Sequence, residues 1–136
     1  MRSTFVVAST LVLTCPALAA GPEIDVRRGE DRLVYGSCVP SLAVENGSAE
    51  TIDYLEIDLL LTLADGTERQ LELQSAYREG IHYPIAPGNR ALLQQHLDTS
   101  PVLGVPCDRV KSRKVMGIVC QTAAGSACAT TVSVVP

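Results

Sequence analysis

Four cysteines of the chain could form disulfides, hold a metal or act as nucleophiles. They are Cys38, Cys107, Cys120 and Cys128. No two of them stand in a C-x-x-C pair, and the two histidines, His82 and His96, lie far from every cysteine in the sequence, which disfavours a zinc site. An even number of cysteines in an exported domain is typical of disulfides, and four cysteines allow three pairings.

Groups suited to catalysis are scarce. A serine or cysteine nucleophile needs a base held against it, and only His82 and His96 could act as that base. His82 lies in a segment rich in proline and glycine, and His96 follows two glutamines, which is typical of surface histidines. The sequence contains no G-x-S-x-G, H-E-x-x-H or G-x-x-x-x-G-K-[ST] motif. We therefore expect no enzymatic activity, no metal and no cofactor, with a hydrolase as the least favoured alternative.

Charged residues recur at every second position in two segments. Glu56 and Asp58 would share the outward face of one strand, a spacing also seen in acid–base pairs and calcium sites, and Arg109, Lys111 and Arg113 would share the outward face of another. If these strands are neighbours, opposite charges facing each other contribute roughly 0.2–1 kcal/mol per pair. A salt ladder that stabilises the sheet is the simpler hypothesis.

The same outward face could instead bind a partner. Tyr54 and Leu60 lie on it among the charges, like the aromatic and aliphatic anchors of an interface with a polar rim. The candidate partner-binding residues are therefore Tyr54, Leu60, Arg109, Lys111 and Arg113.

The first residues have the pattern of a secretory signal peptide. Arg2 supplies the positive charge, residues 5–13 the apolar stretch, and Ala17-Leu18-Ala19 an A-x-A cleavage site. The apolar stretch is shorter than the ~20 residues that span a bilayer. We expect a signal peptide over residues 1–19, which would remove Cys15, and a single domain over residues 20–136 in the periplasm or outside a bacterial cell.

Composition narrows the class of protein. The chain has 136 residues, of which 46% are hydrophobic and 19% charged, and this excludes a disordered tail. The formal net charge of −4 disfavours nucleic acid as a partner.

Alternating apolar and polar residues predict β-strands. The clearest run places Leu55, Ile57, Leu59, Leu61 and Leu63 on one face. Asp65-Gly66 then predicts a hairpin, with a returning strand over residues 67–77. Asn46-Gly47-Ser48 predicts a turn after the preceding strand. Further strand candidates are residues 24–26, 33–35, 38–45, 89–97 (a strand or a short helix), 114–121 and 127–135, with loops over 78–88 and 98–107.

The last two candidates predict a hairpin. Pairing Thr122 with Ser126 leaves a loop of three residues in which Gly125 takes the left-handed position, and it places Cys120 opposite Cys128. The apolar faces would hold Met116, Ile118 and Cys120 on one strand and Cys128, Val132 and Val134 on the other.

About seven short strands without a helix predict an immunoglobulin-like or fibronectin-III-like antiparallel β-sandwich. In such a domain Cys38 and Cys107 lie at one end, and Cys120 and Cys128 at the other. A disulfide tolerates only about 4.4–6.8 Å between Cα atoms, so the predicted bridges are Cys38–Cys107 and Cys120–Cys128.

Several of these segments resemble a known family. They are Val44-Glu45-Asn46-Gly47-Ser48, Tyr54-Leu55-Glu56-Ile57-Asp58-Leu59, Ala64-Asp65-Gly66-Thr67 and Ile85-Ala86-Pro87-Gly88. They are similar to the IrmA family of interleukin-receptor-mimic proteins, which are small, exported and disulfide-bonded. The resemblance implies a fibronectin-III-like fold and a binding protein that is not an enzyme, with a homodimer formed by strand exchange.

We therefore expect an exported protein-binding module that has a protein partner and no membrane span. Recognition would use a sheet face, a loop such as residues 78–88, or an unpaired strand edge. The alternative is an accessory subunit or chaperone of a bacterial surface or envelope assembly.

Overall fold

The computed structural model describes residues 22–75, 83–95 and 102–136. Within these ranges the chain forms nine strands, one short 3₁₀ turn and no α-helix. The elements are β1 (Ile24–Arg28), β2 (Arg32–Val34), β3 (Ser37–Val39), β4 (Ser41–Asn46), β5 (Ile52–Leu63), β6 (Glu68–Ser75), β7 (Arg90–Gln95), η1 (Cys107–Arg109), β8 (Val110–Thr122) and β9 (Val132–Val135). The all-β prediction is confirmed.

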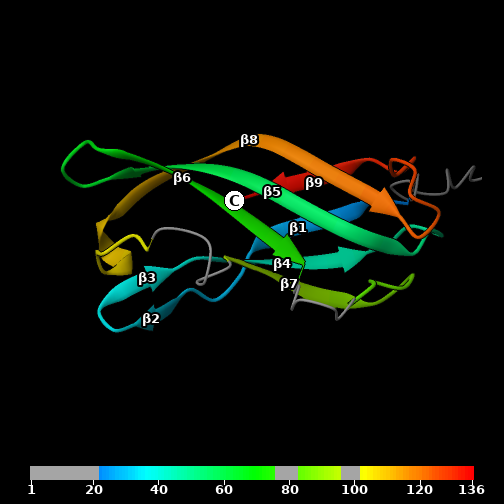
Figure 1. The fold of residues 1–136 in the computed structure, drawn as a ribbon, viewed down its shortest axis with the longest axis horizontal. Coiled ribbons are helices and arrows are strands. Elements are labelled where there is room, and N and C mark those ends of the chain that lie inside the picture. Colours follow the sequence, from blue (N-terminus) through cyan, green and yellow to red (C-terminus); the bar gives the residue numbers. More distant parts are fainter. Residues whose placement is uncertain (1–21, 76–82, 96–101) are drawn as a thin grey trace, which may run out of the picture.

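Seven strands form one hydrogen-bonded sheet in the order β8-β5-β6-β7-β4-β1-β9, and β2 and β3 form a separate hairpin. Neighbours in the large sheet are antiparallel except β1 and β9, which are parallel. The sheet is strongly curled (Figure 1), and the Cys120–Cys128 disulfide joins the end of β8 to the segment before β9. The result is nearly a barrel, because β6 pairs with β7 and so links the two layers that a sandwich would keep apart.

Aliphatic side chains from alternate strand positions fill the interior. All five inward residues predicted for the central strand are at most 4% exposed, and Leu71 and Leu73 of the returning strand are buried with them. Each fully buried Leu or Ile contributes roughly 1.5–3 kcal/mol, so this hairpin supplies much of the core. The inward faces of β5 and β6 are confirmed.

The Asp65-Gly66 turn is also confirmed. Gly66 has φ of 84°, a conformation that glycine adopts without strain, and its amide donates to the carbonyl of Leu63 at 2.9 Å. The hydroxyl and the amide of Thr67 donate to the carboxylate of Asp65 at 2.6 and 2.9 Å. These hydrogen bonds lower the pKa of Asp65.

The structure confirms some of the other predicted strands, divides one of them and describes others only in part. Residues 24–26 and 33–35 become two strands in different sheets, and the segment 38–45 divides at Pro40 into β3 and β4. The segment 89–97 is a strand as far as Gln95, so the helical alternative is wrong for the described part. Parts of the predicted return strand and of the two loops, residues 76–82 and 96–101, lie outside the described residues.

The turn of the last hairpin is confirmed, but its second strand is not placed as predicted. The amide of Thr122 donates to Ser126 at 2.8 Å, the amide of Cys128 donates to Cys120 at 3.0 Å, and Gly125 has φ of 77°. Beyond Cys128 the chain leaves β8, and β9 pairs with β1 instead. The inward valines Val132 and Val134 still pack against the core, because β1 offers them the same apolar interior.

The predicted apolar face of β8 needs a correction. Met116 is 54% exposed, because the register shifts there: Asp58 pairs with Gly117 and Leu59 with Val115, which leaves Met116 without a partner on β5. Ile118 lies opposite the buried Ile57 but is 43% exposed, since β8 is the edge of the sheet. Cys120 packs against the core as predicted.

Both predicted disulfides are confirmed. Cys38 and Cys107 are bonded with their Cα atoms 4.7 Å apart, and Cys120 and Cys128 are bonded with theirs 5.4 Å apart.

Asn46 is a polar residue inside the core. It is 0% exposed, and its side-chain amide donates to the carbonyls of Glu50 at 2.8 Å and Ile85 at 2.9 Å. Its side-chain oxygen accepts from the amide and the hydroxyl of Ser48 at 3.1 and 2.6 Å. The side chain therefore joins its own turn to a segment 39 residues away.

Asn46→Ala is expected to lower the free energy of unfolding by about 2 kcal/mol, because each buried group left without a hydrogen-bond partner costs about 1–3 kcal/mol. Urea unfolding monitored by circular dichroism measures the change. Asn89→Ala is the matched control, since Asn89 is exposed and its replacement should change stability by less than about 0.5 kcal/mol. Equal effects of the two substitutions would show that the buried network contributes nothing.

Candidate functional site

Three carboxylates gather on the outward face of β5 and β6. Glu56, Asp58 and Glu72 each place an oxygen within 4.8 Å of the others. The hydroxyl of Tyr54 donates a short hydrogen bond to Glu56, and the side-chain amide of Gln74 donates to the same oxygen at 3.1 Å. The sheet itself builds this cluster, because Asp58 and Glu72 are directly paired across the two strands.

Burial and nearby negative charge raise the pKa values of two side chains at this cluster. Burial raises the pKa of Tyr54, and the hydrogen bond to Glu56 with the nearby carboxylate charges raises it further. Burial also raises the pKa of Asp58, and the charge of Glu56 adds to this effect. Tyr54 and Asp58 thus hold their protons more tightly than isolated side chains would. Gly117 lies opposite Asp58, and a Cβ atom there would lie 2.9 Å from the Asp58 carboxylate.

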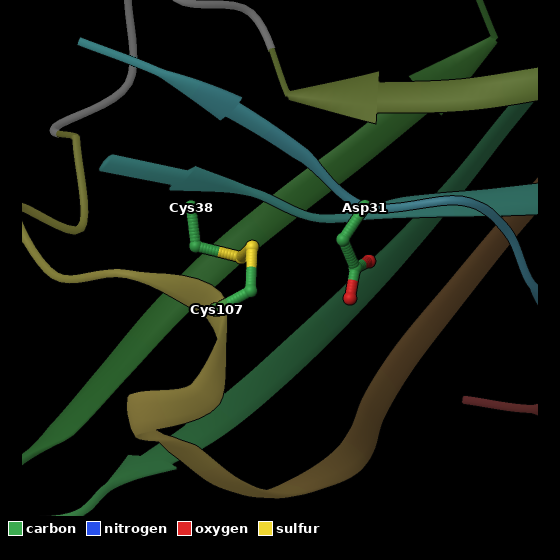
Figure 2. A group of neighbouring side chains, drawn as sticks. All are labelled: Asp31, Cys38 and Cys107. Carbon is green, nitrogen blue, oxygen red and sulfur yellow. A yellow bond between two sulfur atoms is a disulfide. The ribbon is translucent and has the colours of Figure 1, made fainter. Parts of the chain in front are cut away.

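Among the described residues, two groups have ligand atoms close enough to surround a metal ion. The carboxylate cluster offers the oxygen ligands that hard cations prefer, and one carboxylate oxygen of Asp58 is buried without a hydrogen-bond partner. The other group is Asp31 with Cys38 and Cys107 (Figure 2). The two sulfur atoms are bonded to each other, and the Asp31 carboxylate is engaged by arginine, so this group is a structural centre.

The structure separates the predicted partner-binding residues. β5 and β8 are neighbours as predicted, and Tyr54 and Leu60 are half-buried on the outward face of β5. The predicted salt ladder, however, is wrong. The residues opposite Glu56 and Asp58 are Val119 and Gly117, because the antiparallel register brings the basic half of β8 to the other end of β5.

The three predicted cations occupy three different environments. Arg109 lies in η1, before β8 begins, and is exposed. Lys111 is exposed at a second register shift, between the pairs Thr62–Ser112 and Leu63–Val110. Arg113 lies opposite Leu61 and therefore points inward, where its side chain is only 4% exposed.

Arg113 forms a buried ion pair that the sequence did not reveal. One of its nitrogens lies 2.5 Å from the carboxylate of Asp31, whose side chain is 9% exposed. Arg28 contacts the same oxygen at 2.7 Å from the more exposed side. Burial alone would raise the pKa of Asp31, but the hydrogen bonds and charges of Arg113 and Arg28 outweigh it and hold that pKa below its usual value. Asp31 and Arg113 are 82 residues apart, so no local pattern marks the pair.

A shallow groove crosses the outward face of β1, β4 and β7. Its volume is about 570 Å³. Arg27 pairs with Asp25 at 2.7 Å, and Arg90 pairs with Glu45 at 3.5 Å, while Leu92 is 48% exposed beside them. The charges of this groove compensate one another, so it favours neither sign of ligand.

The edge strand β8 carries three exposed large apolar side chains, more than any other described strand. Met116, Ile118 and Val119 are 54%, 43% and 39% exposed there. Among the described residues, no backbone hydrogen bond reaches the outer side of residues 111–119, since β5 occupies the other side and the contact with Cys128 begins only at Cys120. We call residues 111–119 the β8 edge.

Comparison with known proteins supports the fold alone. The solved structure of IrmA from Escherichia coli superposes with a TM-score of 0.53 and 14% sequence identity, covering 83% of this chain and 91% of that one. No protein-family model and no curated protein matches the sequence. The resemblance seen in the sequence thus extends to a structural relationship with IrmA.

Two further observations bear on location. Both disulfides fit an oxidising compartment outside the cytoplasm. The described residues include no helix that is long and apolar enough to cross a bilayer.

Proposed function

We propose that the protein is an exported binding module without enzymatic activity, built on an immunoglobulin-like or fibronectin-III-like framework, that recognises a protein partner through the β8 edge. The exposed apolar side chains along this free edge carry the proposal. A long edge strand with apolar side chains and one unpaired side is costly to leave in water and is a template for another strand. Domains that bind peptides by strand addition use such an edge, with main-chain hydrogen bonds supplying affinity and side chains supplying specificity.

The length of β8 supports this proposal. It has 13 residues, whereas β9, at the other end of the sheet, has four. Proteins usually keep edge strands short when the edge has no use. The two carboxyl groups with lowered pKa values have structural roles, since Asp31 lies in an ion pair and Asp65 in a turn.

The proposal predicts that the affinity for the partner falls when the exposed apolar side chains of the β8 edge are replaced by polar ones. In Met116→Ser/Val119→Ser, both replaced side chains are exposed, so the fold should persist while binding weakens at least tenfold. Pull-down from the native envelope with quantitative mass spectrometry identifies the partner, and titration with the purified partner measures the affinity.

Two matched variants make this test specific. Leu92→Ser alters the groove on β7, and Tyr54→Ser/Leu60→Ser alters the outward face of β5. Both should bind as the unmodified protein does, provided that circular dichroism shows the same fold. If the edge variant binds equally well and one of these two variants does not, recognition belongs to that other surface and the proposal is wrong.

A further inference from the structure

We infer that the partner adds an extended segment to the β8 edge, antiparallel to it, in which apolar side chains come first and acidic side chains follow. This inference rests on the proposed function and specifies the chemistry of the partner.

The first half of the β8 edge is basic and uncompensated. Lys111 and Lys114 are the only lysines in the chain, and both are exposed on this strand, with the exposed Arg109 directly before it. Within the described residues no carboxylate pairs with any of the three. The chain as a whole has a net charge of −4, so this cluster is opposite in sign to the chain's net charge. Acidic side chains on a partner would supply the missing charges.

The second half of the edge contains no charge. Residues 115–122 are all neutral, and the exposed Met116, Ile118 and Val119 lie within them. A partner that covers them needs apolar side chains at the matching positions. Antiparallel pairing is slightly more stable per residue than parallel pairing. In that orientation the apolar half of the partner segment precedes its acidic half.

A second copy of this chain is a poor occupant of the same edge. β8 contains no Asp or Glu, so pairing β8 with itself would leave the cations Lys111 and Lys114 without counter-charges. Lysines and bulges on an edge strand are features that prevent non-specific pairing, and the β8 edge has both. The β8 edge therefore disfavours pairing with the β8 edge of a second copy, and it favours a strand that carries acidic side chains.

Two synthetic peptides as long as the β8 edge test the inference. One has an apolar half of alternating Thr and Val followed by an acidic half of alternating Thr and Glu, and the other has the same halves in reverse order. Each is titrated into the oxidised protein while backbone amide resonances are recorded. The first peptide should bind at least several-fold more tightly, shift the amides of residues 111–119 and protect them from hydrogen exchange.

Reversing the charge of the two lysines measures how much electrostatic attraction contributes to peptide binding. Lys111→Glu/Lys114→Glu should weaken binding of the first peptide at least tenfold, and added salt should weaken binding to the unmodified protein. The control Arg27→Glu/Arg90→Glu makes the same change of charge on the exposed groove residues and should have no effect.

Other results would overturn the inference. They are equal affinity for an uncharged peptide of Thr and Val, tighter binding of the reversed peptide, amide shifts confined to the groove of β1, β4 and β7, and self-association of the protein through residues 111–119. None of these results bears on the capture experiment with the Met116→Ser/Val119→Ser variant. The binding function could therefore stand while the acidic, antiparallel partner is rejected.

Discussion

Cys38→Ala/Cys107→Ala is expected to lower the free energy of unfolding by about 4 kcal/mol. The bridge spans 69 residues of chain, and the entropy that a crosslink removes from the unfolded state grows with the logarithm of the loop it closes. The second bridge spans only eight residues, so Cys120→Ala/Cys128→Ala should cost less, roughly 2–3 kcal/mol.

The contacts around the Cys38–Cys107 bridge determine how much of this decrease in the free energy of unfolding is observed. The amide of Cys38 donates to Val105 at 2.7 Å, and the amide of Gly104 donates to the hydroxyl of Ser37 at 2.9 Å. These hydrogen bonds hold the segment before η1 against β3 in the folded state. Removing the disulfide should therefore act mainly by raising the conformational entropy of the unfolded chain. Urea unfolding of both double variants under oxidising conditions measures it. Equal losses from the two variants would contradict a dominant contribution from loop entropy.

The sequence was sufficient to predict both pairings, because they depend only on the order of the strands and on the end of the domain at which each cysteine lies. It was equally sufficient for the hairpin of β5 and β6. Strict alternation from Leu55 to Leu63 assigns each side chain to a face, and Asp65-Gly66 sets the register. Periodicity and turn chemistry are local, so they can be read without the rest of the fold.

Features that depend on pairing between distant strands could not be predicted. Alternation along β8 placed Arg113 outward with Lys111, but the register shift at Met116 reverses the alternation and turns Arg113 inward, opposite Leu61. The same shift leaves Met116 of the predicted apolar face without a partner on β5. A single extra residue in a strand exchanges its two faces, and no residue type in this segment marks where it occurs.

The pairing partner of β9 could not be predicted for a related reason. Val132 and Val134 are inward whether β9 pairs with β8 or with β1, so the apolar pattern is the same in both arrangements. The free edge of β8 exists because β9 leaves it. The surface that carries the proposed function therefore could not be derived from the alternation that predicts the strands.

Arg113→Met is expected to lower the free energy of unfolding by about 3 kcal/mol at pH 7, because it leaves the buried carboxylate of Asp31 without its closest partner. We place the value at the lower end of the range for buried pairs, since Arg28 still contacts Asp31. Arg27→Met is the matched control. Its ion pair with Asp25 is 2.7 Å long but 72% exposed on the arginine side, and should contribute at most about 1 kcal/mol.

A double variant tests whether charge or packing causes the loss. Asp31→Leu/Arg113→Met removes both charges and should be more stable than Arg113→Met alone, because a buried pair replaced by apolar side chains leaves no desolvated charge. If the double variant is no more stable than the single one, the methylene groups of Arg113 and their packing matter more than its charge.

The dependence on pH follows from the lowered pKa of Asp31. Its folded-state pKa lies below the ordinary value of 3.8, so the ionised carboxylate stabilises the fold fully above that value. This contribution declines as the pH falls through the lower folded-state pKa, where the carboxylate is protonated even beside Arg113. The difference in stability between the unmodified protein and Arg113→Met should therefore be largest at neutral pH and shrink below about pH 4. Urea unfolding of both proteins across this range measures it, and a difference that stays constant or grows in acid would show that Asp31 is not the group stabilised by Arg113.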